Sequence, residues 1–135
     1  MSTIEGGCAC GAIRFEIEGP LMGSGACHCR ACQYASGGAP AYLGIAPSTG
    51  FKVTKGTPKR YVSKGDSGGD VVRNFCPNCG TSLFSELANS PITPVKLGAL
   101  DDPSSYAPGM HFYVSEAQPW HHITQGVPTF PKAPG

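Results

Sequence analysis

The chain has 135 residues, a length typical of one domain, and its 40% hydrophobic content excludes a disordered, charge-rich tail. Glycine (19) and proline (13) are abundant and only 14% of the residues are charged, so we expect many turns and few exposed helices. The formal net charge of +1 lacks the basic excess of a nucleic-acid-binding protein. The five basic residues within 52–64 are interpreted as a solvated surface, and no nucleic-acid partner is expected.

The predicted elements are strands, with one short helix. Residues 12–18 alternate apolar and polar side chains and predict the clearest strand, which ends at Gly19-Pro20. Further strands are predicted, in chain order, over 40–46, 51–54, 59–62, 70–75, 81–87, 94–100 and 110–114. Good helix formers followed by Gly37-Gly38 predict a helical turn over 30–36. The result is a mostly antiparallel β fold in a single domain, 1–135, whose proline-rich residues 126–135 form a loose tail.

The sequence also bears on where the chain acts. It has no run of about 18 consecutive apolar residues, so no membrane partner is expected. Its first residues lack the basic and apolar regions of a signal peptide. We therefore expect a cytoplasmic protein, in which thiols stay reduced. The sequence does not predict an oligomeric state.

Seven cysteines are the most informative feature, and they fall into three clusters. These are Cys8 with Cys10, then Cys27, Cys29 and Cys32, and finally Cys76 with Cys79. An odd number cannot be fully paired as disulfides. Close spacing instead brings thiolates to one tetrahedral metal, so we predict metal binding, with zinc as the ion.

The natural partition of the seven thiols is four plus three. Two C-x-C or C-x2-C knuckles close one tetrahedral site, so Cys8, Cys10, Cys76 and Cys79 are predicted to hold a structural zinc that joins distant segments. Cys27, Cys29 and Cys32 supply three ligands, with Cys29 and Cys32 on one face of the helical turn. Three ligands leave an open position, as in catalytic zinc sites. A histidine is the alternative fourth ligand, and the candidates are His28, His111, His121 and His122.

Several motifs together resemble the glutathione-dependent formaldehyde-activating (GFA) family, which includes centromere protein V. The motifs are Gly6-Gly7-Cys8-Ala9-Cys10-Gly11, Cys27-His28-Cys29-Arg30-Ala31-Cys32, Phe75-Cys76-Pro77-Asn78-Cys79-Gly80, Gly98-Ala99-Leu100-Asp101-Asp102-Pro103, and His111-Phe112-Tyr113-Val114 with Pro119-Trp120. The resemblance extends from about Gly6 to Pro131. It implies a β-tent fold, related to type B methionine sulfoxide reductases, that is pinned by the structural zinc.

The resemblance also implies an activity. The family's catalytic zinc maps onto Cys27, Cys29 and Cys32, which gives two zinc ions per chain, the second site being partly occupied. The implied enzyme is a zinc-dependent carbon–sulfur lyase similar to S-(hydroxymethyl)glutathione synthase. It joins or splits a glutathione-like thiol and a small aldehyde such as formaldehyde, and these two small molecules are the expected partners.

Two further residues are candidates for catalysis. His111 matches a histidine position of the family and is a candidate proton shuttle. Arg30 lies inside the metal cluster and is a candidate either to bind a substrate carboxylate or to balance the charge of the thiolates. The four arginines of the chain form no evident clamp for glutathione. The competing hypothesis is therefore a zinc-stapled β module that binds a partner without catalysis. Trp120 is expected to pack in the core.

Overall fold

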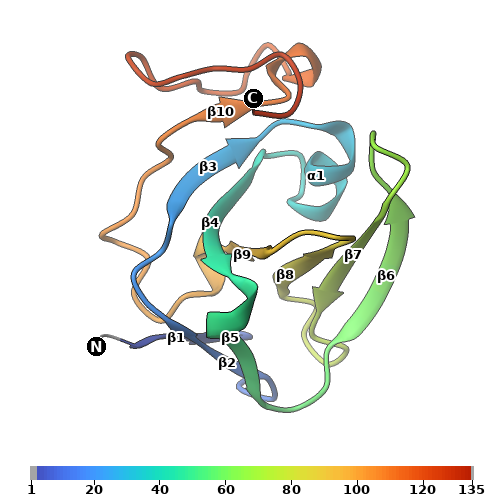
Figure 1. The fold of residues 1–135 in the computed structure, drawn as a ribbon, viewed down its shortest axis with the longest axis vertical. Coiled ribbons are helices and arrows are strands. Elements are labelled where there is room, and N and C mark those ends of the chain that lie inside the picture. Colours follow the sequence, from blue (N-terminus) through green and yellow to red (C-terminus); the bar gives the residue numbers. More distant parts are fainter. Residues whose placement is uncertain (1–2, 135) are drawn as a thin grey trace.

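The computed structural model describes residues 3–134, and its strands form two sheets (Figure 1). The smaller sheet has the order β1-β2-β5, formed by β1 (Thr3–Gly7), β2 (Arg14–Glu18) and β5 (Phe51–Lys55). The larger sheet contains, in spatial order, β10 (His111–Phe112), β3 (Gly23–Cys27), β4 (Ala41–Pro47), β9 (Ile92–Lys96), β8 (Ser82–Leu87), β7 (Asp70–Phe75) and β6 (Lys59–Lys64). Neighbours are antiparallel except β10 and β3, which are parallel. The predicted mostly antiparallel β fold is confirmed.

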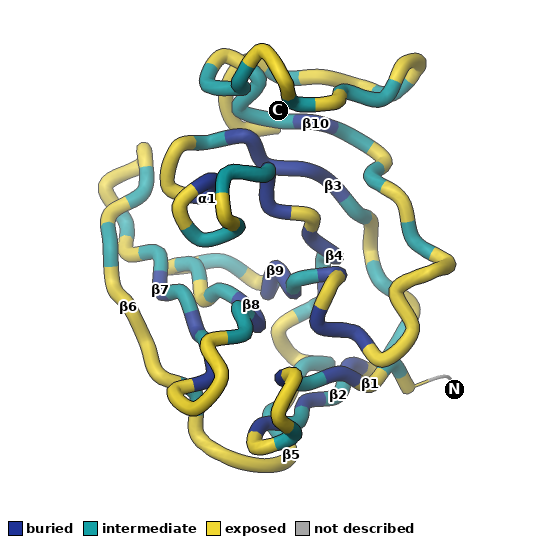
Figure 2. Tube along the Cα trace, turned by 180° about the vertical axis from the view of Figure 1, so that it is seen from behind, coloured by how far each residue is buried: buried dark blue, intermediate teal, exposed yellow. Residues whose placement is uncertain are grey.

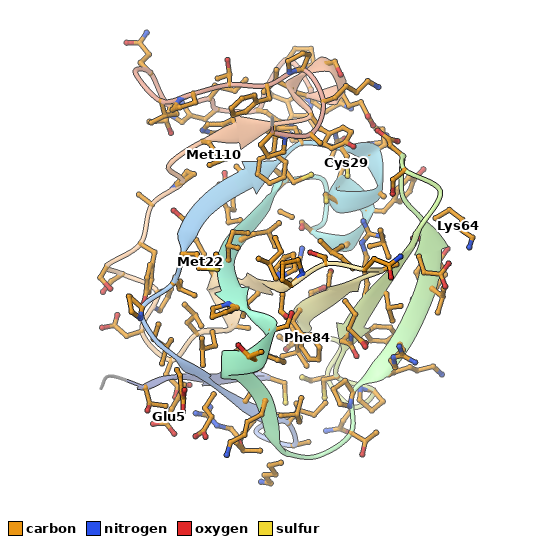
Figure 3. All side chains as sticks on the ribbon, in the orientation of Figure 1. Glu5, Met22, Cys29, Lys64, Phe84 and Met110 are labelled. Atoms are coloured by element: carbon orange, nitrogen blue, oxygen red, sulfur yellow. The ribbon has the colours of Figure 1, made fainter. Side chains whose placement is uncertain are left out.

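The main core lies where the two sheets meet. Phe15 and Ile17 on β2 alternate with charged residues, so both point inward and are 1% and 0% exposed. The ring of Phe51 on β5 packs against Phe15 at 5.4 Å and against Phe84 on β8 at 4.5 Å between centroids. Figure 3 shows Phe84 near the middle of the molecule. This aromatic row joins the smaller sheet to the larger one.

The one α-helix among residues 3–134, α1 (Arg30–Ala35), lies near the end of β3 (Figure 1). Its N-cap is Cys29, whose thiol sulfur accepts the Cys32 N–H at 3.2 Å. The predicted helical turn is confirmed, and Gly37 with φ +69° follows its end. Three short 3₁₀ turns complete the regular elements: η1 (Ser48–Gly50), η2 (Leu97–Ala99) and η3 (Val114–Glu116). No helix in residues 3–134 is long and apolar enough to cross a membrane.

Two strands of the structure, β1 and β3, are not predicted from the sequence, and two predicted strands end earlier than expected. β1 and β3 are rich in glycine and lack the alternation that marks a half-buried strand, so their existence depends on pairing with β2 and β4. The strand predicted over 94–100 stops at Lys96, where η2 begins. The strand predicted over 110–114 is limited to β10, because Tyr113 takes a left-handed conformation with φ +57°.

The C-terminal segment is not the loose tail that the sequence predicts. Residues 128–132 run beside β10 and η3, and Thr129 forms a parallel bridge with His111. The His111 and Val114 N–H groups donate to the carbonyls of Pro128 and Phe130 at 3.0 and 3.1 Å, and Phe130 N–H donates to the His111 carbonyl at 2.9 Å. Proline removes donors but keeps its carbonyl acceptor, so a proline-rich segment can still pair along one edge. Figure 2 shows this segment lying along β10, of which His111 is buried and Phe112 is half-buried. Gly135 lies outside the described residues.

Candidate metal centres

The four cysteines predicted to form one site are brought together by the fold. The sulfur atoms of Cys8, Cys10, Cys76 and Cys79 lie within 4.8 Å of one another. Cys8 and Cys10 follow β1, whereas Cys76 and Cys79 follow β7, so this group joins the two sheets. Cys8 and Cys76 are buried against the main core, and Cys10 and Cys79 are exposed.

Hydrogen bonds surround the sulfur atoms of this group. The Ile13 N–H donates to Cys8 Sγ at 3.1 Å, and the Asn78 side-chain amide donates to Cys10 Sγ at 3.2 Å. Hydrogen bonds with Thr81 lower the pKa of Cys79 to about 5. Donors around sulfur favour the thiolate, which is the form that binds metal.

The other three cysteines also converge. The sulfur atoms of Cys27, Cys29 and Cys32 lie within 4.8 Å of one another, where β3 ends and α1 begins. Figure 3 shows Cys29 in this upper part of the molecule. Cys27 and Cys32 are buried and Cys29 is half-buried. Within residues 3–134, no histidine, aspartate or glutamate joins this group as a fourth ligand atom.

Both groups fit zinc. A tetrahedron with Zn–S bonds of about 2.3 Å has sulfur–sulfur edges of about 3.8 Å. The Cys8–Cys10 and Cys10–Cys76 sulfur pairs are 3.6 and 3.8 Å apart. All seven cysteines are free rather than disulfide-bonded. A set of soft sulfur donors at these distances selects zinc or iron over hard oxygen-preferring cations.

Three of the four histidines contact one another instead of closing the three-cysteine group. His28 Nε2 lies 2.8 Å from His111 Nδ1, and His28 Nδ1 lies 2.9 Å from His121 Nδ1. His28 and His111 are 0% and 1% exposed. His121, one of the four candidate ligands from the sequence, is instead the third member of this row of histidines. Pairing of β10 with β3, and the return of the chain at His121, bring these three side chains together.

Backbone groups at both ends fix the protons along this row of histidines. His121 Nε2 donates to the Gly38 carbonyl at 2.8 Å, which leaves His121 Nδ1 to accept from His28. His28 Nε2 then accepts from His111 Nδ1, and His111 Nε2 accepts the Thr124 N–H at 3.1 Å. All three rings are neutral in this arrangement. Burial, reinforced by the neighbouring His111 and His121, lowers the pKa of His28 to about 4.

The two catalytic candidates from sequence have other contacts. Both ring nitrogens of His111 are used in the row of histidines. Arg30 is exposed, its guanidinium lies 4.8 Å from the Tyr34 ring centroid, and its backbone N–H donates to Glu116 at 2.9 Å. Trp120, expected in the core, is instead 69% exposed and meets the His121 ring edge-on. The prediction that Trp120 packs in the core is wrong.

Arg73 and Lys96 approach the three-cysteine group, although the sequence analysis assigns no role to either residue. Arg73 Nη2 on β7 lies 4.0 Å from Cys32 Sγ. Lys96, the last residue of β9, is half-buried, and the charge of the Cys32 thiolate opposes the lowering of its pKa by burial. Hydrogen bonds with Cys27 and Cys29 lower the pKa of Cys32, and Lys96 and Arg73 lower it further. No local motif marks either cation, because strand pairing alone places them beside Cys32.

A cavity of about 390 Å³ lies beside these two cations. Ala31, Tyr34 and Ala35, on one face of α1, form one wall. Tyr61, Arg73 and Ser85 form a row across β6, β7 and β8 on the opposite wall. Lys96 also lines the cavity. Arg73 and Lys96 therefore belong both to the cavity and to the surroundings of Cys32.

Tyr113 connects the β6–β7 hairpin to the three-cysteine group. Its side chain packs against the buried group that includes Cys27 and Cys32. Its hydroxyl donates to Asp66 in the turn between β6 and β7 at 2.7 Å, and this acceptor raises the pKa of Tyr113. The β6–β7 hairpin is thereby tied to the C-terminal part of the chain.

The fold and site define a β protein with one four-cysteine and one three-cysteine group, and comparisons with known proteins agree. The family model described as "Glutathione-dependent formaldehyde-activating enzyme" (GFA) matches residues 3–116. The chain belongs to this family. A crystal structure of a Rhodobacter sphaeroides protein has the same fold, with a TM-score of 0.57, 22% identity, and coverage of 72% of this chain and 87% of that one. The expected β-tent type of fold is thus confirmed.

Two curated relatives carry enzyme names. A Phaeosphaeria nodorum protein named "Putative glutathione-dependent formaldehyde-activating enzyme" is 24% identical over 113 residues, which cover 84% of this chain and 53% of that protein. A Schizosaccharomyces pombe protein named as an uncharacterized lyase is 32% identical over 97 residues, which cover 66% of this chain and 61% of that protein. The chain therefore spans between half and two thirds of the length of these relatives.

Proposed function

We propose that this chain is a single-domain, zinc-dependent carbon–sulfur lyase of the GFA type, which joins or splits a thiol and a small aldehyde. In this proposal Cys8, Cys10, Cys76 and Cys79 hold a structural zinc, and Cys27, Cys29 and Cys32 hold the catalytic one. The observation that carries the proposal is the three-thiol group with no fourth ligand atom from residues 3–134. A reducing compartment such as the cytoplasm keeps these thiols available.

Cys27, Cys29 and Cys32 would hold this zinc, which when bound would supply the positive charge that lowers the pKa of a substrate thiol. Side chains around the three-cysteine group position its sulfur atoms and offset their charge. Cys29 caps α1 with its sulfur, which fixes its position relative to Cys32. Arg73 and Lys96 offset negative charge on the sulfurs, so an additional anionic thiolate is accepted more readily. Tyr113 and α1 pack around the group and limit access of water.

The test is whether a small thiol enters the coordination sphere. In protein loaded with two zinc ions, X-ray absorption at the zinc edge should give an average of 3.5 sulfurs per zinc before thiol is added, since four and three sulfurs share two ions, and an average of 4 afterwards. Proton release in weak buffer should accompany binding. With formaldehyde present, adduct formation should exceed the uncatalysed reaction, and Cys27→Ser should abolish the excess.

The same experiment separates the proposal from a non-catalytic binding module. A sulfur count that stays at 3.5 when thiol is added, with nitrogen already in the fourth position, would contradict the lyase proposal. His122→Ala is a matched control, because His122 is exposed and lies outside the row of histidines. It should leave the thiol-dependent change intact.

A further inference from the structure

The cavity beside Cys32 has a charge pattern that suits one kind of ligand. Its lining contains two cationic side chains, Arg73 and Lys96, and no aspartate or glutamate from the described residues. Neither cation has a carboxylate within ion-pairing distance in residues 3–134, whereas Arg14, Arg60 and Lys64 each do. The cavity therefore favours an anion, and its lining offers no carboxylate to pair with an ammonium group.

The two cations keep donors free for a ligand. Arg73 Nη1 donates to Ser63 Oγ at 3.1 Å and Nη2 approaches Cys32, but a guanidinium has five N–H donors. Lys96 Nζ donates to Ser36 Oγ at 3.2 Å, which uses one of its three donors. A carboxylate in the cavity would accept from both side chains.

The rest of the lining is mainly aromatic and small. Tyr34 on α1 and Tyr61 on β6 both line the cavity and are 81% and 61% exposed. Phe75 and Phe84 add apolar surface. An apolar ligand group that covers these exposed rings would remove apolar surface from water, which favours binding. The cavity volume of about 390 Å³ suits a small molecule.

The cavity lies close enough to the three-cysteine group for one small molecule to reach both, with a thiol at one end and its charge at the other. Arg73 Nη2 lies 4.0 Å from Cys32 Sγ. With a Zn–S bond of about 2.3 Å and a hydrogen bond of about 2.9 Å, a carboxylate on Arg73 lies within about 9 Å of the metal position. A sulfur and a carboxylate separated by one aromatic ring or a short chain span such a distance.

We infer that this cavity binds the carboxylate end and apolar body of the thiol substrate, so that the preferred substrate is a mercapto acid with a single carboxylate and no ammonium group rather than glutathione. Glutathione brings an ammonium group, for which the lining offers no carboxylate. This inference rests on the proposed function for the thiol, but the anion subsite is a property of the cavity alone.

A carboxylate without a thiol tests the subsite independently of zinc chemistry. The zinc-loaded protein is titrated with benzoate and with benzamide, its uncharged match, and binding is measured by NMR shifts of Tyr34 and Tyr61. Benzoate should bind at least tenfold more tightly than benzamide. Arg73→Gln and Lys96→Gln should each weaken benzoate at least fivefold, whereas Arg73→Lys should retain most of the affinity.

Arg60→Gln is the matched control, since Arg60 precedes Tyr61 on β6, its side chain pairs with Glu86, and it does not line this cavity. It should leave benzoate binding unchanged. The anion subsite would be contradicted if benzoate and benzamide bound equally well. It would also be contradicted if neither Arg73→Gln nor Lys96→Gln weakened benzoate binding. These cations would then only offset the charge of the thiolates.

A second arm keeps the two proposals distinguishable. 4-Mercaptobenzoate should bind at least tenfold more tightly than benzoate, and more tightly than glutathione, because it adds the sulfur contact. Glutathione binding more tightly than 4-mercaptobenzoate would overturn the assigned substrate class. If benzoate binds through Arg73 but the thiol group adds no affinity, the subsite stands and the proposed lyase function fails.

Discussion

At the residue scale, glycines that follow two of the cysteine clusters determine their shape. Gly11 after Cys10 and Gly80 after Cys79 have φ of +80° and +79°, in the left-handed region. Gly80 N–H donates to the Cys76 carbonyl at 2.9 Å, which closes the turn that presents both sulfurs. The conformation, not crowding, requires glycine there, since an added Cβ at Gly80 meets no atom within 4 Å.

We expect Gly80→Ala to destabilise the protein by about 1–2 kcal/mol, the cost of placing an L-residue in the left-handed region. Gly98→Ala is the matched control, because a Cβ there also meets nothing within 4 Å but its φ is not left-handed. Urea denaturation of both variants measures the difference. Equal stability of the two variants would show that the backbone conformation at Gly80 does not constrain the site.

Burial of histidine in the neutral form makes stability depend on pH. Burial, with the charge of His122 as the next cause, lowers the pKa of His111 below its ordinary value of about 6.5. The unfolded chain then binds a proton that the folded chain does not. Stability contributed by neutral His111 is complete above about pH 6.5 and is lost as the pH falls from there toward the folded pKa.

The free energy of unfolding of the wild type should therefore fall more between pH 7.5 and 5.5 than that of His111→Gln, by up to about 1 kcal/mol. Metal release at the lower pH affects both proteins, so only the difference between them is diagnostic. Urea denaturation at both pH values provides it. The same pH dependence in both proteins would indicate that His111 titrates alike in the folded and unfolded states.

At the scale of elements, the C-terminal segment completes the edge of the larger sheet. β10 contributes only two residues and pairs in parallel with β3, and the segment that follows pairs with β10 in turn. His28 N–H donates to the Phe112 carbonyl at 2.9 Å, so the same edge supports the start of the three-cysteine group. The segment therefore supports β3 indirectly, because it pairs with β10, which pairs with β3.

Hydrogen exchange should show slow exchange for the amides of His111, Tyr113, Val114 and Phe130, whose acceptors all lie within this pairing. Deleting residues 127–135 should remove several backbone hydrogen bonds, each worth about 1 kcal/mol, and accelerate exchange at His111 and His28. Fast exchange of the four amides in the intact protein would mean that the segment is loose after all. Exchange at Val72 in β7 serves as the internal reference for global unfolding.

At the scale of the whole molecule, the two cysteine groups differ in what they connect. The four-cysteine group joins segments separated by 76 − 10 = 66 residues and ties β1 to β7. The three-cysteine group spans only residues 27–32. Metal binding free energy is folding free energy where no preformed site exists in the unfolded chain, and closing the longer loop restricts that chain more.

Cys76→Ser should therefore lower the melting temperature by on the order of 10 °C or more, and Cys29→Ser should lower it clearly less. Native mass spectrometry should find up to two zinc ions in the wild type and loss of one in each variant. A larger effect of Cys29→Ser would reverse the assigned roles. A folded wild type without metal would contradict both sites.

The sequence by itself determined what depends on neighbours along the chain. Alternation at Phe15 and Ile17 sufficed to predict β2, and the capping geometry at Cys29 follows from the short helical run after it. The spacing of the cysteines sufficed to group them. Ligands two or three residues apart are constrained by local backbone geometry, so their convergence needs no knowledge of the rest of the fold.

The tertiary structure decided everything that depends on strands pairing across long distances in sequence. Arg73 and Lys96 meet Cys32 only because β7 and β9 lie in one sheet with β3, and their local sequences carry no sign of it. His28 and His111, 83 residues apart, meet because β10 pairs with β3. Register across a sheet is set by the packing of the whole core, so the charges around a site are decided there and not by the motif that marks it.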